Sequence, residues 1–162
     1  MPVKGDTMAN QYEHLFVRDM PIIVGEMDNE GEAAGLEQPK NLGDGFWLMH
    51  SKLVPESQIN MTHIWVHEVS EPVHWVNPHT HDYDEILIWT GSNPDDPRDL
   101  GAEITMEIDG EKHTITTSGS VYIPAGTVHC PLDFVRVDRP FRFSALSLAP
   151  KYTSNKDAAQ AA

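Results

Sequence analysis

From about residue 46 onward, short apolar runs follow one another along the chain. In the last of these runs, Phe141, Phe143 and Ala145 alternate with mostly polar neighbours, which is the pattern of a strand with one buried face. The runs predicted to be strands are 46–50, 60–69, 85–90, 103–108, 113–116, 121–123 and 141–148. Helical periodicity is almost absent from this part of the chain, so we expect mainly β-structure.

Turn-forming residues separate most of the predicted strands. Such sites are Asn77-Pro78, Asp109-Gly110, Ser118-Gly119 and the segments 92–97 and 138–140. Many short strands at close spacing, with Gly and Pro between them, predict an all-β sandwich or barrel. The Asn, Asp and Pro cluster between Gly91 and Gly101 is too polar for a core, and we expect it to be a surface loop near the mouth of the functional site. No internal repeat is visible.

The two ends of the chain are less regular. Residues 12–20 could form a short strand or helix, and the acidic, glycine-containing stretch 25–35 is predicted to be a loop. Residues 151–162 are small and polar, which is typical of a frayed end or a short terminal helix. With 162 residues, of which 40% are hydrophobic, the chain can bury one sizeable core but hardly two, so we expect one compact domain.

Charge and cysteine content narrow the range of partners and compartments. Eleven Lys and Arg against 25 Asp and Glu give a net charge of -14, which argues against binding to nucleic acid or to anionic membranes. An anionic substrate is not excluded, because a bound divalent cation can override the surface average. The single cysteine, Cys130, suits a reducing compartment. The sequence shows no signal peptide and no stretch of about 18 apolar residues, so we expect a cytoplasmic protein.

Four side chains have the types and spacing of a metal site: His79, His81, Glu85 and His129. Successive side chains of a strand point to opposite faces, so His79 and His81 would share a face, with α-carbons roughly 6.6 Å apart. Cys130 is next to His129, so in a strand it would point to the face opposite to that of His129. We expect Cys130 to be a small buried residue rather than a ligand. Three imidazoles and a carboxylate suit one divalent transition metal, which could be Fe, Mn, Ni, Cu or Zn.

These residues lie in two motifs that resemble those of the cupins. The first cupin motif is Gly-x5-His-x-His-x3,4-Glu-x6-Gly, and its counterparts here are His79, His81, Glu85 and Gly91, with Val73 in place of the leading glycine and five residues before Gly91. The second is Gly-x5-Pro-x-Gly-x2-His-x3-Asn, and its counterparts are Gly119, Pro124, Gly126 and His129, with four residues before the proline and Asp133 in place of the asparagine. All four ligand positions are kept.

The resemblance covers about residues 41–150 and implies a cupin-like double-stranded β-helix, a jelly-roll barrel. Residues 1–40 would be an N-terminal arm and residues 151–162 a C-terminal tail. The resemblance also implies that the four residues coordinate one metal inside the barrel and leave positions open for water, substrate or dioxygen, as catalytic sites do. The alternative is a metal-free cupin in which they only line a pocket. Such a group would be costly to bury without an ion or a full set of partners.

Several other polar residues could contribute to the site. His63, His67 and Trp65 would share a face if 61–69 is a regular strand, so they could line a substrate cavity, although surface or satisfied core positions are the commoner outcome. His74 could support a ligand or carry a proton, although a structural role is again the commoner one. The residues that could orient a ligand histidine by accepting its free N–H are Asp82, Tyr83 and Asp84.

Cupins include dioxygenases, isomerases, decarboxylases, lyases, sugar epimerases and non-catalytic binding domains, so the resemblance alone does not select a reaction. We favour a metal-dependent enzyme that acts on a small oxygenated organic molecule, with a non-haem dioxygenase slightly ahead. The alternatives are a redox-neutral isomerase, lyase or hydrolase that uses the metal as a Lewis acid, and a binding module without turnover. Cupin barrels commonly pair, so a homodimer in which the N-terminal arm packs across the interface is also expected.

Overall fold

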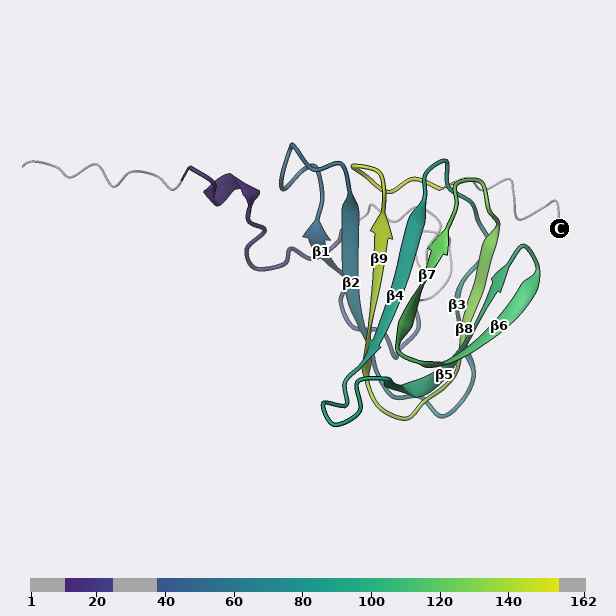
Figure 1. Cartoon of the computed structure of the whole chain (residues 1–162). Coiled ribbons are helices and arrows are strands. Elements are labelled where there is room, and N and C mark those ends of the chain that lie inside the picture. The colour runs from purple at the N-terminus through teal and green to yellow at the C-terminus, as the bar shows by residue number, and fades with distance from the viewer. Residues whose placement is uncertain (1–10, 25–37, 155–162) are drawn as a thin grey trace, which may run out of the picture.

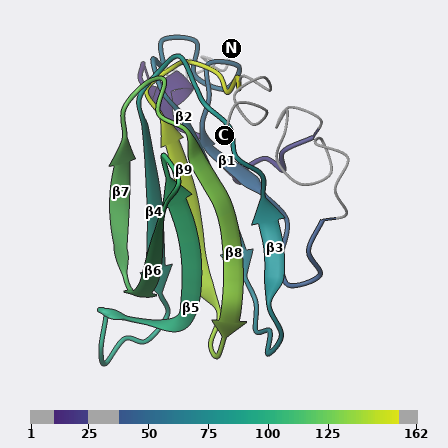
Figure 2. The ribbon, with the colours of Figure 1, turned by 90° about the vertical axis from the view of Figure 1, so that its right-hand side faces the viewer.

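The computed structural model describes residues 11–24 and 38–154. The strands, all of them within residues 38–154, form two antiparallel sheets that face each other. The five-stranded sheet has the order β1 (Phe46–Met49), β2 (Asn60–Val66), β9 (Phe141–Ser147), β4 (Glu85–Gly91) and β7 (Gly119–Ile123). The four-stranded sheet has the order β3 (Val73–Val76), β8 (His129–Val137), β5 (Asp99–Ile108) and β6 (Glu111–Thr117). The chain crosses repeatedly from one sheet to the other, which produces the jelly-roll barrel of Figures 1 and 2.

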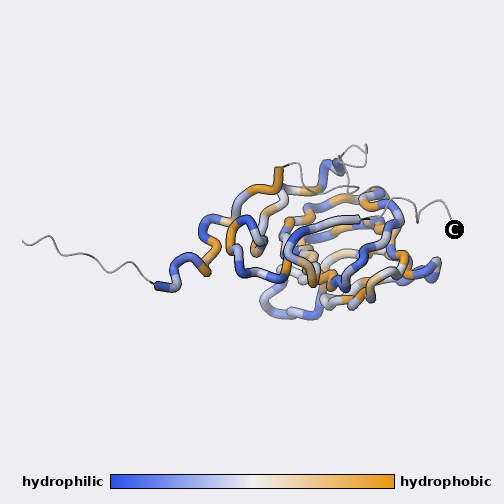
Figure 3. The backbone as a smooth tube through the Cα atoms, turned by 90° about the horizontal axis from the view of Figure 1, so that it is seen from above, coloured by the Kyte–Doolittle hydropathy of each residue, from blue (hydrophilic) through white to orange (hydrophobic). Residues whose placement is uncertain are grey.

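The hydrophobic core fills the space between the sheets. Along β9 the side chains at alternate positions are buried, as the alternating sequence predicts. Trp75 of β3 stacks on Phe134 of β8 with ring centroids 5.5 Å apart, and its edge meets the ring of Phe143 from the opposite sheet at 5.0 Å. These aromatic contacts join the two sheets near the middle of the barrel. Figure 3 shows hydrophobic positions recurring along the strands of both sheets.

All seven predicted strands are present with slightly different ends, and two further strands were not predicted. β3 is only four residues long and includes a histidine. β8 contains Pro131 together with charged residues, so its sequence lacks the regular apolar pattern of a strand. The expectation that the His-x-His segment lies in a strand was only partly right. His79 forms an isolated bridge with His129, and His81 lies between this bridge and β4.

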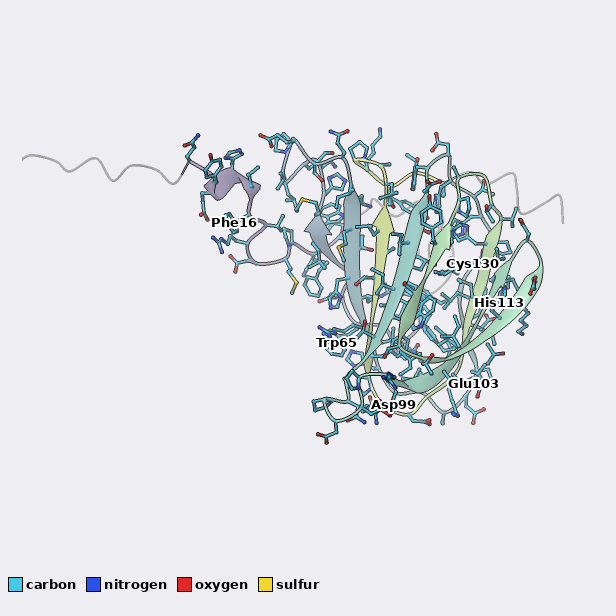
Figure 4. All side chains as sticks on the ribbon, in the orientation of Figure 1. Phe16, Trp65, Asp99, Glu103, His113 and Cys130 are labelled. Carbon is cyan, nitrogen blue, oxygen red and sulfur yellow. The ribbon has the colours of Figure 1, made fainter. Side chains whose placement is uncertain are left out.

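The strand register defines two ends of the barrel. At one end, Glu85 of β4 pairs with Ser147 of β9, and β8 begins at His129; we call this the site end. At the other, the far end, Gly91 of β4 pairs with Phe141. The polar loop 92–98 leaves from Gly91, so the expectation that it lies near the mouth of the site was wrong. Figure 4 shows the same separation, with Cys130 near the site end and Asp99 at the far end.

Before the barrel, part of the N-terminal region is described. A 3-10 helix, η1 (Glu13–Leu15), occupies part of the segment for which a strand or a helix was expected. Residues 21–23 then run along the edge of β1, where the amide of Trp47 donates to the carbonyl of Pro21 over 2.9 Å. η1 itself projects away from the barrel (Figure 1). The loop expected over 25–35 and the end of the expected tail, 155–162, lie outside the described residues.

Candidate metal centre

The backbone brings the two histidine motifs together at the site end of the barrel. The amide of His79 donates to the carbonyl of His129 over 3.0 Å, and the amide of His129 donates back to the carbonyl of His79 over 3.1 Å. The amide of Gly126 donates to the carbonyl of His81 over 2.8 Å. Gly126 has a φ of +80°, a left-handed conformation that glycine adopts without strain. The Pro-x-Gly turn therefore holds the second motif against the first.

Asp84 makes a further connection between the motifs. Its carboxylate accepts a hydrogen bond from the amide of Ala125 over 2.8 Å and a second from the hydroxyl of Tyr122. These bonds lower the pKa of Asp84, the one from Tyr122 most. Asp84 was a candidate for orienting a ligand histidine, but the structure places its carboxylate on the turn that follows β7. It therefore stabilises the frame of the site rather than a ligand.

The four predicted ligands converge in one small volume. The candidate donor atoms of His79, His81 and His129 all lie within 4.8 Å of one another, so these three histidines could hold a metal ion. Oε2 of Glu85 is 3.3 Å from Nε2 of His129 and 3.6 Å from Nε2 of His81. Glu85 comes from the five-stranded sheet and His129 from the four-stranded sheet, so residues far apart in the sequence form one group.

This group is almost completely buried, and several of its polar atoms make no hydrogen bond. None of the four side chains belongs to a residue that is more than 3% exposed. Among the described residues, Nε2 of His79, Nε2 of His129 and Oε1 of Glu85 are buried atoms with no hydrogen-bond partner. Leaving such atoms unsatisfied costs on the order of 1 to 3 kcal/mol each. A cation placed among them would remove this cost, so the residues present fit a metal ion.

Hydrogen bonds to the other ring nitrogens set the tautomer of each histidine. Nδ1 of His79 donates to the carbonyl of Asn77 over 2.9 Å, and Nδ1 of His129 donates to the carbonyl of Thr127 over 3.1 Å. Nδ1 of His81 donates to the carbonyl of Thr153 over 2.6 Å. A neutral imidazole with its proton on Nδ1 presents a lone pair at Nε2. With the proton on Nδ1, each of these histidines directs its Nε2 nitrogen towards the cluster as an acceptor, beside the carboxylate of Glu85.

The protonation states also suit metal ligands. Burial, followed by the proximity of His129, lowers the pKa of His79 to about 4. Burial alone would raise the pKa of Glu85, but the neighbouring His129 and His81 outweigh it and lower this pKa to about 2. Near neutral pH, His79 is thus a neutral imidazole and Glu85 an ionised carboxylate. Metal ions bind these forms and compete with protons for them.

The segment after β9 contributes to the site in a way that the sequence did not reveal. The ring of Tyr152 is buried and meets the ring of His81 edge-on, with centroids 5.0 Å apart. The ring of Tyr83 also stacks on the ring of His81, with centroids 4.8 Å apart. The hydroxyl of Tyr83 donates to the carbonyl of Thr153 over 2.7 Å. Burial raises the pKa of Tyr83 to about 12, so its hydroxyl keeps its proton. Tyr83 therefore contacts His81 directly through its ring and indirectly through Thr153.

Two more buried polar residues lie beside Glu85 and were not predicted. The strand register places Asn60, Ser147 and Glu85 next to one another across β2, β9 and β4, and all three are at most 2% exposed. Oδ1 of Asn60 and Oγ of Ser147 have no hydrogen-bond partner among the described residues. Ser147 lowers the pKa of the Tyr83 hydroxyl, against the larger rise that burial causes. Only the strand register reveals that Asn60 and Ser147 lie beside Glu85.

The remaining candidates lie away from this group. His63 and Trp65 are on the outer face of β2, where His63 contacts the hydroxyl of Ser144 at 3.2 Å, so they do not line the barrel interior. His67 is exposed. Nδ1 of His74 is 2.7 Å from Asp133, and its Nε2 is 3.0 Å from the side chain of Asn77. Cys130 is buried in the hydrophobic core, as expected.

Known structures resemble this arrangement of strands. The oxalate oxidase in complex with the substrate analogue glycolate aligns with a TM-score of 0.52 and 11% identity, over 96% of this chain and 67% of that one. The DMSP lyase DddQ from Ruegeria pomeroyi DSS-3 aligns with a TM-score of 0.50 and 13% identity, over 88% of this chain and 64% of that one. The chain has the cupin fold. It spans about two thirds of the length of these two cupins.

Sequence comparison adds no relative to these structures. No protein-family model matches this chain, and no curated protein matches it. At identities of 11% and 13%, the structural likenesses establish the fold and not the reaction. Within residues 11–24 and 38–154, no helix has the length and hydrophobicity that a membrane crossing requires.

Proposed function

We propose that this cupin is a metal-dependent enzyme in which His79, His81, Glu85 and His129 hold one divalent transition metal. The main support for the proposal is that buried ring nitrogens and a buried carboxylate oxygen converge at one place. The protons of His79 and His129 are on the other ring nitrogen, Nδ1, where each is donated to a backbone carbonyl. The mixed set of imidazoles and one carboxylate suits Fe, Mn, Ni, Cu or Zn.

The substrate that we propose is a small oxygenated molecule bound beside Glu85. A metal in this position would supply Lewis-acid chemistry and, if redox-active, a place where dioxygen and substrate meet. The amide of Asn60 and the hydroxyl of Ser147 can each donate and accept hydrogen bonds, so they could orient a carbonyl, a hydroxyl or a carboxylate. Among the described residues no Lys or Arg is buried, so an anionic group would have to be neutralised by the metal itself.

We favour a non-haem dioxygenase, with a redox-neutral lyase, isomerase or hydrolase as the alternative and a non-catalytic small-molecule binder after it. The two structural neighbours illustrate the choice, because one is named an oxidase and the other a lyase. Both kinds of chemistry are therefore compatible with the fold. Our preference rests on the ligand set of three histidines and one carboxylate, a nitrogen-rich environment of the kind that iron and copper accept.

The first test is metal analysis of the purified protein and of three variants. We expect about one equivalent of transition metal per chain in the unsubstituted protein. The variants His79→Ala and Glu85→Gln should lose most of it, because each removes one donor from a small set. His113→Ala is the control, because His113 is exposed on β6 and is not part of the cluster. Full metal retention by His79→Ala would contradict the proposed ligand set.

The second test separates the candidate reactions. The protein is loaded anaerobically with Fe²⁺, and oxygen uptake is followed with diketone, thiol and phenolic compounds. Uptake coupled to loss of the compound would support the dioxygenase. Conversion without oxygen would support the Lewis-acid alternative, and tight retention of a compound without product would support a binding module.

We also propose that the protein is a homodimer. The segment before the barrel exposes several large apolar side chains, among them Phe16 at 54% and Val24 at 77% exposure. The outer face of the five-stranded sheet carries an apolar row across four strands, formed by Met61, Leu146, Ile86 and Tyr122. Apolar side chains gathered on the outside of a sheet favour association.

The cytoplasmic location expected from the sequence likewise stays a prediction.

A further inference from the structure

The three histidines of the cluster differ in where their Nδ1 proton is held. His79 and His129 each donate to a carbonyl two residues earlier in the chain, at Asn77 and Thr127. These two bonds are local and form together with the motifs themselves. His81 instead donates to the carbonyl of Thr153, 72 residues away, in the segment that follows β9. One of the three proposed ligands thus depends on a distant part of the chain.

The contact between this segment and the motif is extensive. The carbonyl of Thr153 accepts from Nδ1 of His81 over 2.6 Å and from the hydroxyl of Tyr83 over 2.7 Å. The amide of Thr153 donates back to the same hydroxyl over 3.0 Å. Tyr152 is 9% exposed and places its ring against His81. Tyr83 and Thr153 therefore form a reciprocal pair of bonds that fixes the carbonyl at one position.

We infer that Tyr83 and the segment Tyr152–Thr153 are positioning elements of the metal site, which fix the orientation and tautomer of His81. The inference rests on the metal site proposed above. It adds Tyr83, Tyr152 and Thr153, none of which is a proposed metal ligand. Its physical basis is that a hydrogen bond to the remote ring nitrogen both orients an imidazole and makes its other nitrogen a better ligand. Without the Thr153 carbonyl, the proton of His81 could move to Nε2, and the lone pair would then point away from the cluster.

The chain offers matched pairs of variants for a test. Thr153→Pro removes the amide proton that donates to Tyr83, whereas Thr153→Ala keeps the whole backbone and removes only the side chain. Tyr83→Phe removes the hydroxyl that holds Thr153. Tyr12→Phe is its control, because it removes the hydroxyl of an exposed tyrosine in the segment before the barrel. All variants are made in the full chain.

The measurement is Co²⁺ binding by calorimetry, together with the visible absorption of bound Co²⁺ and the melting temperature of the metal-free protein. We expect Thr153→Pro and Tyr83→Phe to weaken binding by about 10- to 100-fold. The absorption bands should shift, because the His81 ligand is displaced. The melting temperature of the metal-free protein should stay close to that of the unsubstituted chain. Thr153→Ala and Tyr12→Phe should leave both affinity and spectrum unchanged.

A double variant tests whether both changes act through one contact. Because Thr153→Pro and Tyr83→Phe disrupt the same pair of bonds, the double variant should bind Co²⁺ no more weakly than the weaker of the two single variants. Unchanged affinity and spectrum in both single variants would overturn this inference while leaving the metal site intact. If the unsubstituted protein binds no Co²⁺, both the metal site and this inference are overturned.

Discussion

At the scale of single residues, the sequence contained most of the site. The four proposed ligands were predicted from their types and spacing, and the structure brings all four together. The supporting residues were not predictable in the same way. Thr153 acts through a backbone carbonyl that any residue could supply, so its side chain carries no signal. Asn60 becomes a neighbour of Glu85 only through the pairing of β2, β9 and β4.

His79 makes the stability of the metal-free protein depend on pH. Its pKa is about 4 in the folded protein against an ordinary value of 6.5, so between these values the unfolded chain binds a proton that the folded chain excludes. Stability is therefore unaffected above about pH 6.5 and falls as the pH drops towards 4, by a total on the order of 3 kcal/mol for this residue. We expect urea midpoints of the metal-free protein to fall across this window.

The matched variant for this prediction is His79→Gln, which keeps a polar side chain but cannot titrate. Its urea midpoint should change less between pH 6.5 and pH 4.5 than that of the unsubstituted protein. Glu85 contributes at lower pH. Its pKa is about 2 in the folded protein against an ordinary value of 4.5, so its contribution to stability is lost only as the pH falls below 4.5. Parallel pH profiles for the two proteins would show that His79 is not the group responsible.

At the scale of strands, alternation and turn residues predicted most elements and failed where function or proline interrupts them. β9 was recognisable because every second side chain is buried. β8 was missed because its sequence begins His-Cys-Pro and includes further polar residues, although it pairs with both β3 and β5 at the centre of its sheet. Strand pairing, rather than local preference, decides the structure there. The position of loop 92–98 also depended on register, which the sequence does not specify.

Gly91 provides a test at this scale. It ends β4, and a β-carbon added to it would lie 2.0 Å from the carbonyl oxygen of Asp99. Gly91→Ala must therefore separate two backbone segments, and we expect it to lower the free energy of unfolding by at least about 2 kcal/mol. Gly119→Ala is the control, because its added carbon would meet Trp89 at an ordinary 3.4 Å. Equal stability of the two variants in chemical denaturation would contradict this account of the far end.

At the scale of the whole molecule, the charge distribution favours a particular surface for pairing. The chain carries a net charge of -14, so two copies repel each other over most of their surfaces. The outward positions of β2, β9 and β4 contain no Asp or Glu, and their only fully charged residue is Arg142. This face is therefore where two copies could approach with the least repulsion and the most apolar contact. Its composition was in the sequence, but its continuity across strands was not.

The dimer can be tested by a charge placed on this face. Ile86 lies in the middle of the apolar row, with Leu146 on one side and Tyr122 on the other. Ile86→Glu should convert the dimer into a monomer when mass is measured by light scattering during size-exclusion chromatography. Lys112→Glu makes a larger change in net charge on exposed β6 and should leave the mass unchanged. A single-chain mass for the unsubstituted protein would remove the proposal.

The origin of the proposed ligands has a mechanical consequence. Glu85 begins a strand of one sheet and His129 begins a strand of the other, so an ion shared between them would cross-link the two walls of the barrel. This cross-link would act at one rim only; the opposite rim, around Gly91 and Asp99, is held by close backbone packing together with an ion pair between Asp99 and Arg139. Occupancy would then stiffen the rim that carries the site, whereas the stiffness of the far rim would be the same with or without the ion.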